Sequence, residues 1–184
     1  MAGCHMLVGK STKVEGLANG FTIVELLVVI VVIAILASIT VVAYNGVQQR
    51  ANNSARLNEF NQWRKLYEIY KVQNGTYPTM ADGGYCLGTG FPGAKCRDYL
   101  ANNGNTLTEL SSVPLMDKLK TVATLPQANH VPINGTVGPY VYYGGGWLQM
   151  TGVFNGGVSD CPKGLSYTWD DGNGRLLCYV DLQI

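Results

Sequence analysis

An apolar run extends from Phe21 to Tyr44 and contains a single charged side chain, Glu25. At a rise of about 1.5 Å per residue, a helix over this run is long enough to cross a bilayer core of roughly 30 Å. A carboxylate in hydrocarbon is costly, so Glu25 is expected to have both a partner and a purpose. The run therefore predicts an apolar N-terminal helix, to which the fold of the remaining residues is attached.

The residues at the start of this run form a specific pattern. Gly20 directly precedes Phe21-Thr22-Ile23-Val24-Glu25, and the apolar residues continue from there. This pattern resembles the class III N-terminus of type IV pilin precursors and of their secretion-system relatives, the pseudopilins. The resemblance implies that a prepilin peptidase cleaves after Gly20 and methylates Phe21, which places Glu25 fifth in the mature chain. Residues 1–20 are accordingly expected to be a leader, and Glu25 is expected to direct assembly.

Two plainer interpretations compete with a prepilin. An ordinary single-pass anchor would satisfy the length of the run, but it would require neither Glu25 nor a glycine at the boundary. A secretory signal usually has an apolar core of only about 7–15 residues, followed by a small-residue cleavage site. The run here is longer and has no convincing Ala-x-Ala site after it, so both interpretations are less favoured.

The helix is predicted to continue beyond the apolar run as an amphipathic half over residues 45–75. No proline occurs between Phe21 and Tyr77, and aromatic residues recur at helical spacing, at Phe60, Trp63, Tyr67 and Tyr70. Such a stripe is far more often a packing surface than a ligand site. We therefore expect one face of this half of the helix to pack against a hydrophobic core.

A stop signal follows the amphipathic half. Asn74-Gly75 is a typical helix terminus, and Pro78 lies shortly after it. Together with Tyr70 and Tyr77, these residues resemble the end of the first helix in pseudopilins and many pilins. One feature departs from that family: many type IV pilins carry a glycine and a proline in the apolar half, and residues 34–42 have neither.

Four of the five cysteines lie beyond the apolar run, at Cys86, Cys96, Cys161 and Cys178. An even set suits disulfides in an oxidising exterior, and three pairings are possible. Sequence proximity favours Cys86 with Cys96 and Cys161 with Cys178. Four buried thiols are an alternative. A zinc site is less favoured, because no Cys-x-x-Cys pair occurs and the chain has only two histidines.

The net charge of the expected mature chain bears on its partners. Removing residues 1–20 takes Lys10, Lys13 and Glu15 from the 13 basic and 12 acidic side chains, which leaves 11 of each. A neutral mature chain gives no strong signal for binding nucleic acid through bulk charge.

Candidate chemistry in the head is sparse. His130 is the one histidine left after leader removal, and no hydrolase, zinc-protease or phosphate-loop motif accompanies it. No catalytic residue and no cofactor are therefore expected. Asp170, Asp171 and Asn173 offer oxygen ligands that make a weak calcium candidate, although turn residues are the default interpretation. Three Asn-x-Ser/Thr sequons, at Asn52, Asn74 and Asn134, do not by themselves indicate glycosylation.

Residues 76–184 are predicted to form a globular head. A loop is expected over 79–104, followed by a short helix within 106–120 that Pro114 interrupts. Strands are expected at 137–143, 147–154, 165–169 and 175–180, with a hairpin turn at 170–174. A long helix that covers one face of an antiparallel sheet is an α+β fold.

The family resemblance implies a structural subunit of a type IV pilus-like filament rather than an enzyme. Its partners would be other copies of the chain, the prepilin peptidase, an assembly platform with its ATPase, and the membrane. The chain would lie in the cytoplasmic membrane before assembly and in an extracellular or envelope-spanning filament afterwards. A pseudopilin of a secretion or competence system is the close alternative, and a membrane-tethered binding domain is a more distant one.

Overall fold

The computed structural model describes residues 21–100, 104–128 and 131–182. The first element is the helix α1 (Ile23–Asn74). Internal contacts divide the chain after Tyr44 into two units, which are described separately below. The expected leader and His130 lie outside the described residues.

In the N-terminal unit, α1 is helical from Ile23 onward. The segment Ile23–Thr40 has a mean hydropathy of 3.0 and is long and apolar enough to cross a membrane. The side chains of residues 21–40 are all exposed within this chain. The expected apolar helix is therefore present, and its own chain leaves it uncovered.

The second unit contains the remainder of α1, and the expected aromatic stripe forms its buried face. Phe60, Trp63 and Tyr67 are at most 1% exposed. The helix ends at Asn74, as the stop signal predicts. Gly75 adopts a left-handed backbone with φ of 80°, and its N–H donates to the Lys71 carbonyl (2.8 Å). Glycine suits this position because it takes a positive φ without a steric cost.

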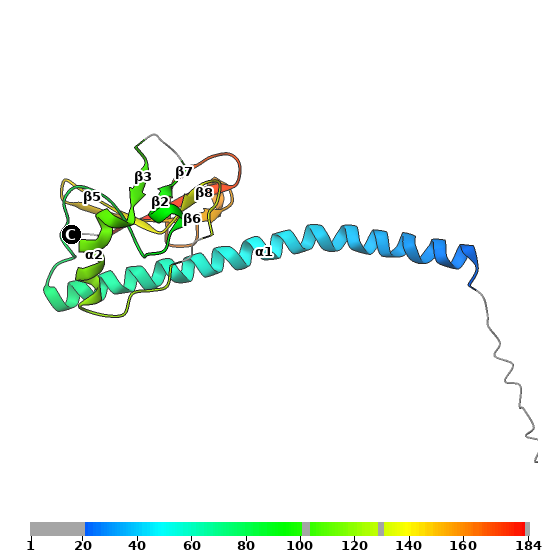
Figure 1. Cartoon of the computed structure of the whole chain (residues 1–184), viewed down its shortest axis with the longest axis horizontal. Coiled ribbons are helices and arrows are strands. Elements are labelled where there is room, and N and C mark those ends of the chain that lie inside the picture. The colour runs from blue at the N-terminus through cyan, green and yellow to red at the C-terminus, as the bar shows by residue number, and fades with distance from the viewer. Residues whose placement is uncertain (1–20, 101–103, 129–130, 183–184) are drawn as a thin grey trace, which may run out of the picture. The chain divides into compact units, whose positions relative to one another are not determined.

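Antiparallel strands build the rest of the head (Figure 1). The larger sheet has five strands in the order β1 (Gly83–Cys86), β5 (Tyr140–Gly144), β6 (Trp147–Asn155), β8 (Arg175–Leu182) and β7 (Ser166–Asp170). The smaller sheet has the order β3 (Thr106–Thr108), β2 (Lys95–Asp98) and β4 (Thr136–Val137). Two short 3-10 helices, Pro92–Ala94 and Val158–Asp160, lie in the connections.

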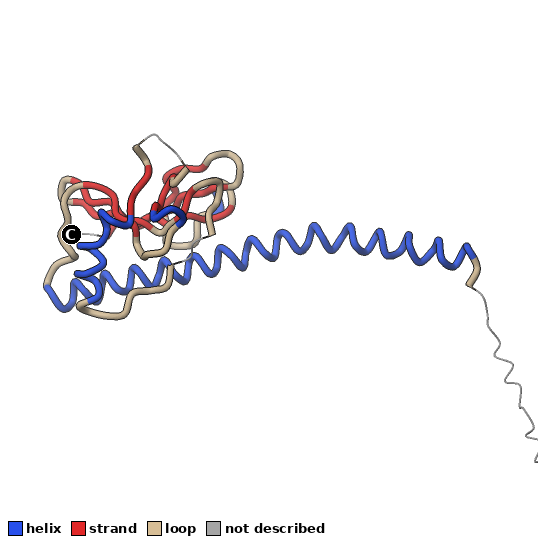
Figure 2. Tube along the Cα trace, viewed as in Figure 1, coloured by secondary structure: helices blue, strands red, loops and turns tan. Residues whose placement is uncertain are grey.

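The main core lies between α1, the helix α2 (Glu109–Lys120) and one face of the five-stranded sheet, and Figure 2 shows the strands beside the C-terminal part of α1. Val141, Tyr143, Leu148 and Met150 contribute from β5 and β6 and pack with the aromatic stripe. Because side chains alternate along a strand, their neighbours Tyr140, Tyr142 and Gln149 face the other side of the sheet. The predicted α+β class, with the stem on one face of the sheet, is confirmed.

Two predicted segments differ in the structure. The expected loop at 79–104 contains β1 and β2, which pair with residues far along the chain: Tyr85 lies opposite Val141, and Arg97 lies opposite Val137. The predicted strand 137–143 is divided, since β4 ends at Val137 and β5 begins at Tyr140. These pairings depend on tertiary contacts that no local pattern encodes.

The expected interruption at Pro114 was also wrong. Pro114 lies inside a continuous α2, which Thr108 caps by accepting a hydrogen bond from the Ser111 N–H. Proline removes one helical hydrogen bond, and the carbonyl left without a partner belongs to Leu110, whose side chain is 83% exposed. The buried face of α2, formed by Ser112, Leu115, Met116 and Leu119, holds the helix through its packing. Tertiary burial outweighs the local cost here.

Candidate functional site

The N-terminal segment presents apolar side chains without cover. Phe21 is 84% exposed and Ile23 is 79% exposed, and the pattern continues along the helix. Exposed apolar area on this scale marks a surface that is buried against a membrane or against other chains. The segment is thus the first candidate site, and its chemistry is association rather than catalysis.

Thr22 and Glu25 form a reciprocal cap at the start of α1. The Thr22 N–H and hydroxyl both donate to Glu25 Oε2, each at 2.8 Å, and the Glu25 N–H donates to Thr22 Oγ1 at 3.2 Å. The Thr22 carbonyl accepts from the Leu26 N–H, as an N-cap carbonyl does. This Thr-x-x-Glu arrangement is a capping box. The carboxylate therefore has a partner within its own first turn, while Gly20 lies outside the described residues.

The capping role of Thr22 was missed in the sequence, although the signal was present. Thr22 stands three residues before Glu25 and directly before the apolar run, which is the capping-box spacing. The box uses Glu25 Oε2; for Glu25 Oε1 no partner is found among residues 21–100, 104–128 and 131–182. That second oxygen can accept a hydrogen bond or an ion pair from another chain.

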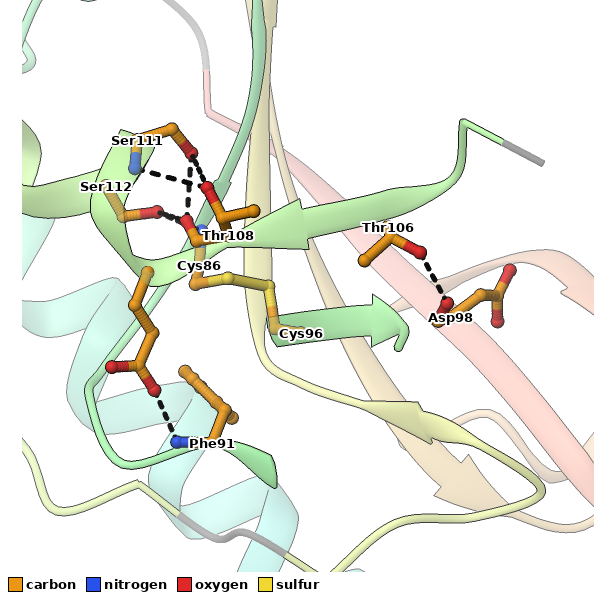
Figure 3. The surroundings of a disulfide bond; sticks show 9 residues. Cys86, Phe91, Cys96, Asp98, Thr106, Thr108, Ser111 and Ser112 are labelled. Atoms are coloured by element: carbon orange, nitrogen blue, oxygen red, sulfur yellow. Dashed lines mark hydrogen bonds between the residues drawn. A yellow bond between two sulfur atoms is a disulfide. The ribbon is translucent and has the colours of Figure 1, made fainter. Parts of the chain in front are cut away.

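A disulfide joins the two sheets of the head. Cys86 of β1 is bonded to Cys96 of β2 with an S–S distance of 2.11 Å, and both residues are fully buried (Figure 3). The Cys86 N–H donates to Ser112 Oγ in α2 (2.7 Å), so the bond lies where helix and sheets meet. The favoured pairing by sequence proximity is the one present.

The second disulfide links the connection between β6 and β7 to β8, the strand between β6 and the edge strand β7. Cys161, which follows the 3-10 helix Val158–Asp160, is bonded to Cys178 of β8 at 2.04 Å. Cys178 is fully buried beside Phe154 and Leu176. This pair is also the one that sequence proximity favours.

The acidic turn between β7 and β8 has internal partners for its side chains. Asp170 Oδ1 accepts from the Gly172 N–H (2.8 Å), and Asp171 Oδ1 accepts from the N–H groups of Asn173 (2.8 Å) and Arg175 (2.9 Å). Burial acts to raise the pKa of Asp171, but hydrogen bonds from Asn134 and these amides bring the pKa below its usual value. Turn formation accounts for the residues considered as calcium ligands. No group of three His, Cys, Asp or Glu side chains suited to a metal occurs within the described ranges.

Arg175 organises a polar network that the sequence analysis did not anticipate. Its Nη1 donates to Asp98 Oδ1 (2.7 Å) and to the Thr136 hydroxyl, which also bonds Asp98. Its Nε lies 3.5 Å from Asp171 Oδ2. The network joins β8, β2 and β4, whose residues are far apart in sequence, so no local spacing could have revealed it.

Buried tyrosines form the other electrostatic feature of the head. Burial raises the pKa of Tyr140 to about 12, despite the opposing effect of the nearby Arg97 guanidinium. Burial also raises the pKa of Tyr67 and Tyr143, whose hydroxyls share a hydrogen bond of 3.3 Å. These phenols are held neutral inside the core.

Comparison with known proteins identifies the N-terminal segment. The prokaryotic N-terminal methylation motif matches residues 17–41, which contain Gly20, Phe21 and Glu25. This N-terminal region is similar to those of type IV pilins and pseudopilins. This pilin-like chain is 38% identical over 60 residues to the type IV wide pilus major component PilA4 of Thermus thermophilus, covering 33% of this chain and 46% of PilA4.

Secretion-system proteins match the pilin-like chain over a similar length. Core protein G of the type II secretion system of Aeromonas hydrophila is 34% identical over 65 residues, which are 35% of this chain and 46% of that protein. The corresponding protein of Vibrio cholerae is 31% identical over 81 residues, covering 44% of this chain and 56% of its own. The chain thus spans about half the length of these relatives. No solved structure matches it.

Proposed function

We propose that this chain is a structural subunit of a type IV pilus-like filament. The observation that carries the proposal is the conjunction of the methylation motif at residues 17–41 with a helix whose apolar residues 21–40 are all exposed. A surface of this kind is stabilised by the membrane before assembly and by the apolar helices of neighbouring subunits afterwards. The head would then be carried on the outside of a bundle of such helices.

The proposal includes a sequence of partners. A prepilin peptidase would cleave after Gly20 and methylate Phe21, and the processed chain would wait in the cytoplasmic membrane. An assembly platform and its ATPase would then add it to the growing fibre. The new Phe21 amine is a cation that can pair with Glu25 of a neighbouring copy, because Glu25 Oε1 is not used by the capping box. No catalytic step is assigned to the chain itself.

Processing is the first test. Intact-mass and N-terminal analysis of chain recovered from the envelope should find residues 1–20 removed and Phe21 methylated. Gly20→Val should retain the leader, whereas Gly16→Val, a matched change within the leader, should be processed normally. Assembled material that still begins at Met1 would overturn the proposal.

A pseudopilin of a type II secretion system is the second candidate. It is supported by the similarity to core protein G, which covers as much of this chain as the similarity to PilA4 does. Deletion of the chain's gene separates the two: loss of surface fibres supports a pilus, and accumulation of secreted proteins in the periplasm supports secretion. A deletion strain with normal fibres and normal secretion would instead favour a membrane-tethered binding domain.

A further inference from the structure

A cavity of about 520 Å³ opens on the face of the five-stranded sheet that points away from α1. Tyr140 and Tyr142 of β5, with Gln149 and Thr151 of β6, form its floor. These side chains alternate with Val141, Tyr143 and Met150, which belong to the core beneath α1. The volume lies within the range of roughly 300–1,000 Å³ that is typical of small-ligand sites.

Arg97 of β2 contributes a cation to this cavity and lacks an acidic partner. Its guanidinium lies 5.7 Å from the centre of the Tyr140 ring and 5.0 Å from that of Tyr142. Its Nε is buried without a hydrogen-bond partner, and no carboxylate of the described chain lies within ion-pair distance of it. Because that atom is sealed from the cavity, a ligand would meet the terminal nitrogens of the guanidinium, which are not among the sealed atoms.

The backbone of Arg97 gives the position a second unusual property. Its φ is 59°, which lies in the left-handed region that residues other than Gly, Asn and Asp rarely adopt. Strained residues of this kind persist where the surrounding structure holds them, and they are concentrated at binding sites. The fold thus maintains an unfavourable backbone at the residue that presents the cation.

Arg175, the other cation of the lining, is already neutralised. It pairs with Asp98 at 2.7 Å and with Asp171 at 3.5 Å. Its guanidinium also lies 4.5 Å from the centre of the Trp169 ring, which forms part of the cavity wall. Arg175 therefore positions Trp169, and the uncompensated positive charge within the described lining belongs to Arg97.

The rest of the lining suits a hydroxylated ring. Trp169 is 44% exposed and offers an apolar face, as does Tyr142. Gln149, Thr151 and Thr168 add amide and hydroxyl groups that both donate and accept hydrogen bonds. A purely aromatic anion would leave these polar groups unmatched, whereas the hydroxyls of a sugar would match them.

We propose that this cavity binds an acidic sugar, with the carboxylate of the sugar on Arg97 and its ring against Trp169 and Tyr142. Arginine binds carboxylates through two parallel, charge-assisted hydrogen bonds, which explains the choice of residue. The proposal concerns the head alone and is independent of how the N-terminal helix assembles. It gives the head the ability to recognise uronic acid residues of a polysaccharide.

The test uses the full processed chain in detergent micelles, titrated with galacturonate and glucuronate by calorimetry. Galactose and glucose are the uncharged counterparts. At least one uronate should bind saturably and at least about tenfold more tightly than its neutral sugar, since the charged contact is lost with the carboxylate. Arg97→Gln should weaken uronate binding by at least about tenfold. Lys95→Gln, which removes an exposed charge from the same strand, should leave the affinity unchanged.

A second pair of variants keeps the test decisive if Arg97→Gln does not form both disulfides. Trp169→Ala should abolish uronate binding, and Trp147→Ala, a half-exposed tryptophan outside the cavity lining, should not. The proposal is overturned by absence of saturable uronate binding, by equal binding of the neutral sugars, or by unchanged binding in a folded Arg97→Gln or Trp169→Ala chain. Saturable binding of a single-stranded oligonucleotide in place of the uronates would also overturn it.

Discussion

The side-chain amide of Asn53 pairs in both directions with the backbone of Asn155. Asn53 Nδ2 donates to the Asn155 carbonyl at 2.7 Å, and Asn53 Oδ1 accepts from the Asn155 N–H at 2.8 Å. One side chain of α1 thus satisfies both backbone groups of the last residue of β6, as a neighbouring strand would. Asn53 therefore attaches its part of α1 to the end of β6.

Asn53→Ala should lower the free energy of unfolding of the head by about 1–3 kcal/mol, because both backbone groups of the partly buried Asn155 lose their partner. Asn52→Ala changes an exposed neighbour and should cost much less. Chemical denaturation of both variants gives the comparison. Equal effects would show that the amide pairing does not contribute to stability.

Arg97→Gly should be more stable than Arg97→Ala by about 1 kcal/mol. Both variants remove the same contacts with Tyr140 and Tyr142, but only glycine adopts a φ of 59° without strain. Thermal unfolding under nonreducing conditions measures the difference. An alanine variant as stable as the glycine variant would show that the backbone at this position is relaxed in solution.

The head should lose stability in alkali between pH about 10 and 12. A tyrosine is neutral when protonated, and the pKa of Tyr140 is raised to about 12 in the folded head, against about 10 when unfolded. The folded state therefore holds this proton more tightly. Its contribution, on the order of 2–3 kcal/mol, is fully present below pH about 10 and is lost as the pH rises through 12.

Denaturant unfolding followed across this pH range tests the role of the buried phenol. Tyr140→Phe should weaken the alkaline loss, and Tyr44→Phe, on an exposed part of α1, should leave it unchanged. A Tyr140→Phe chain with the same pH profile as the parent would assign the loss to other groups.

Replacing either disulfide by two alanines should lower the free energy of unfolding by about 2–4 kcal/mol. The bonds close sequence separations of 10 and 17 residues, so chain entropy predicts similar costs. Their locations differ: hydrogen exchange should rise in β2 and β3 without Cys86–Cys96, and in β7 and β8 without Cys161–Cys178. Cys4→Ala, in the expected leader, is the control. Four alkylatable thiols in the head of chain recovered from the envelope would contradict this prediction.

Glu25→Leu should leave leader cleavage and membrane insertion intact and make filaments scarce, because it removes the carboxylate that we propose to pair with the amine of a neighbouring copy. Thr22→Val removes the hydroxyl of the capping box but keeps the carboxylate, and most filaments should survive it. Fibres counted by electron microscopy against processed monomer in the membrane give the measurement. Normal fibre numbers from Glu25→Leu would show that the charge does not direct assembly.

Local signals predicted the elements that depend on local chemistry. The end of α1 followed from Asn74-Gly75, and the hairpin between β7 and β8 followed from the turn residues 170–174. The structure also contains the two disulfides that were predicted between cysteines close in sequence. In each case the deciding interactions lie within a few residues of one another, so the sequence carries them directly.

The elements that the sequence analysis missed depend on distant partners. Strand β2 is short, and it pairs with β3 and with β4, which lies about forty residues further along. Helix α2 retains Pro114 because its other face is buried. The cavity could not be predicted from the sequence either, because Arg97, Trp169 and Arg175 come together only when the two sheets are assembled.

The contacts of Asn134 determine when this residue can be modified. Its Nδ2, the atom to which a sequon glycan is attached, donates to Asp171 Oδ2 (2.9 Å) and to the Asn173 carbonyl (3.1 Å). Thr136, which completes the sequon, is fully buried. Asn134 is exposed, but a glycosyltransferase that meets the folded head would have to displace both hydrogen bonds and reach past the buried Thr136. Folding before modification would therefore disfavour a glycan at Asn134, even though the sequon is present.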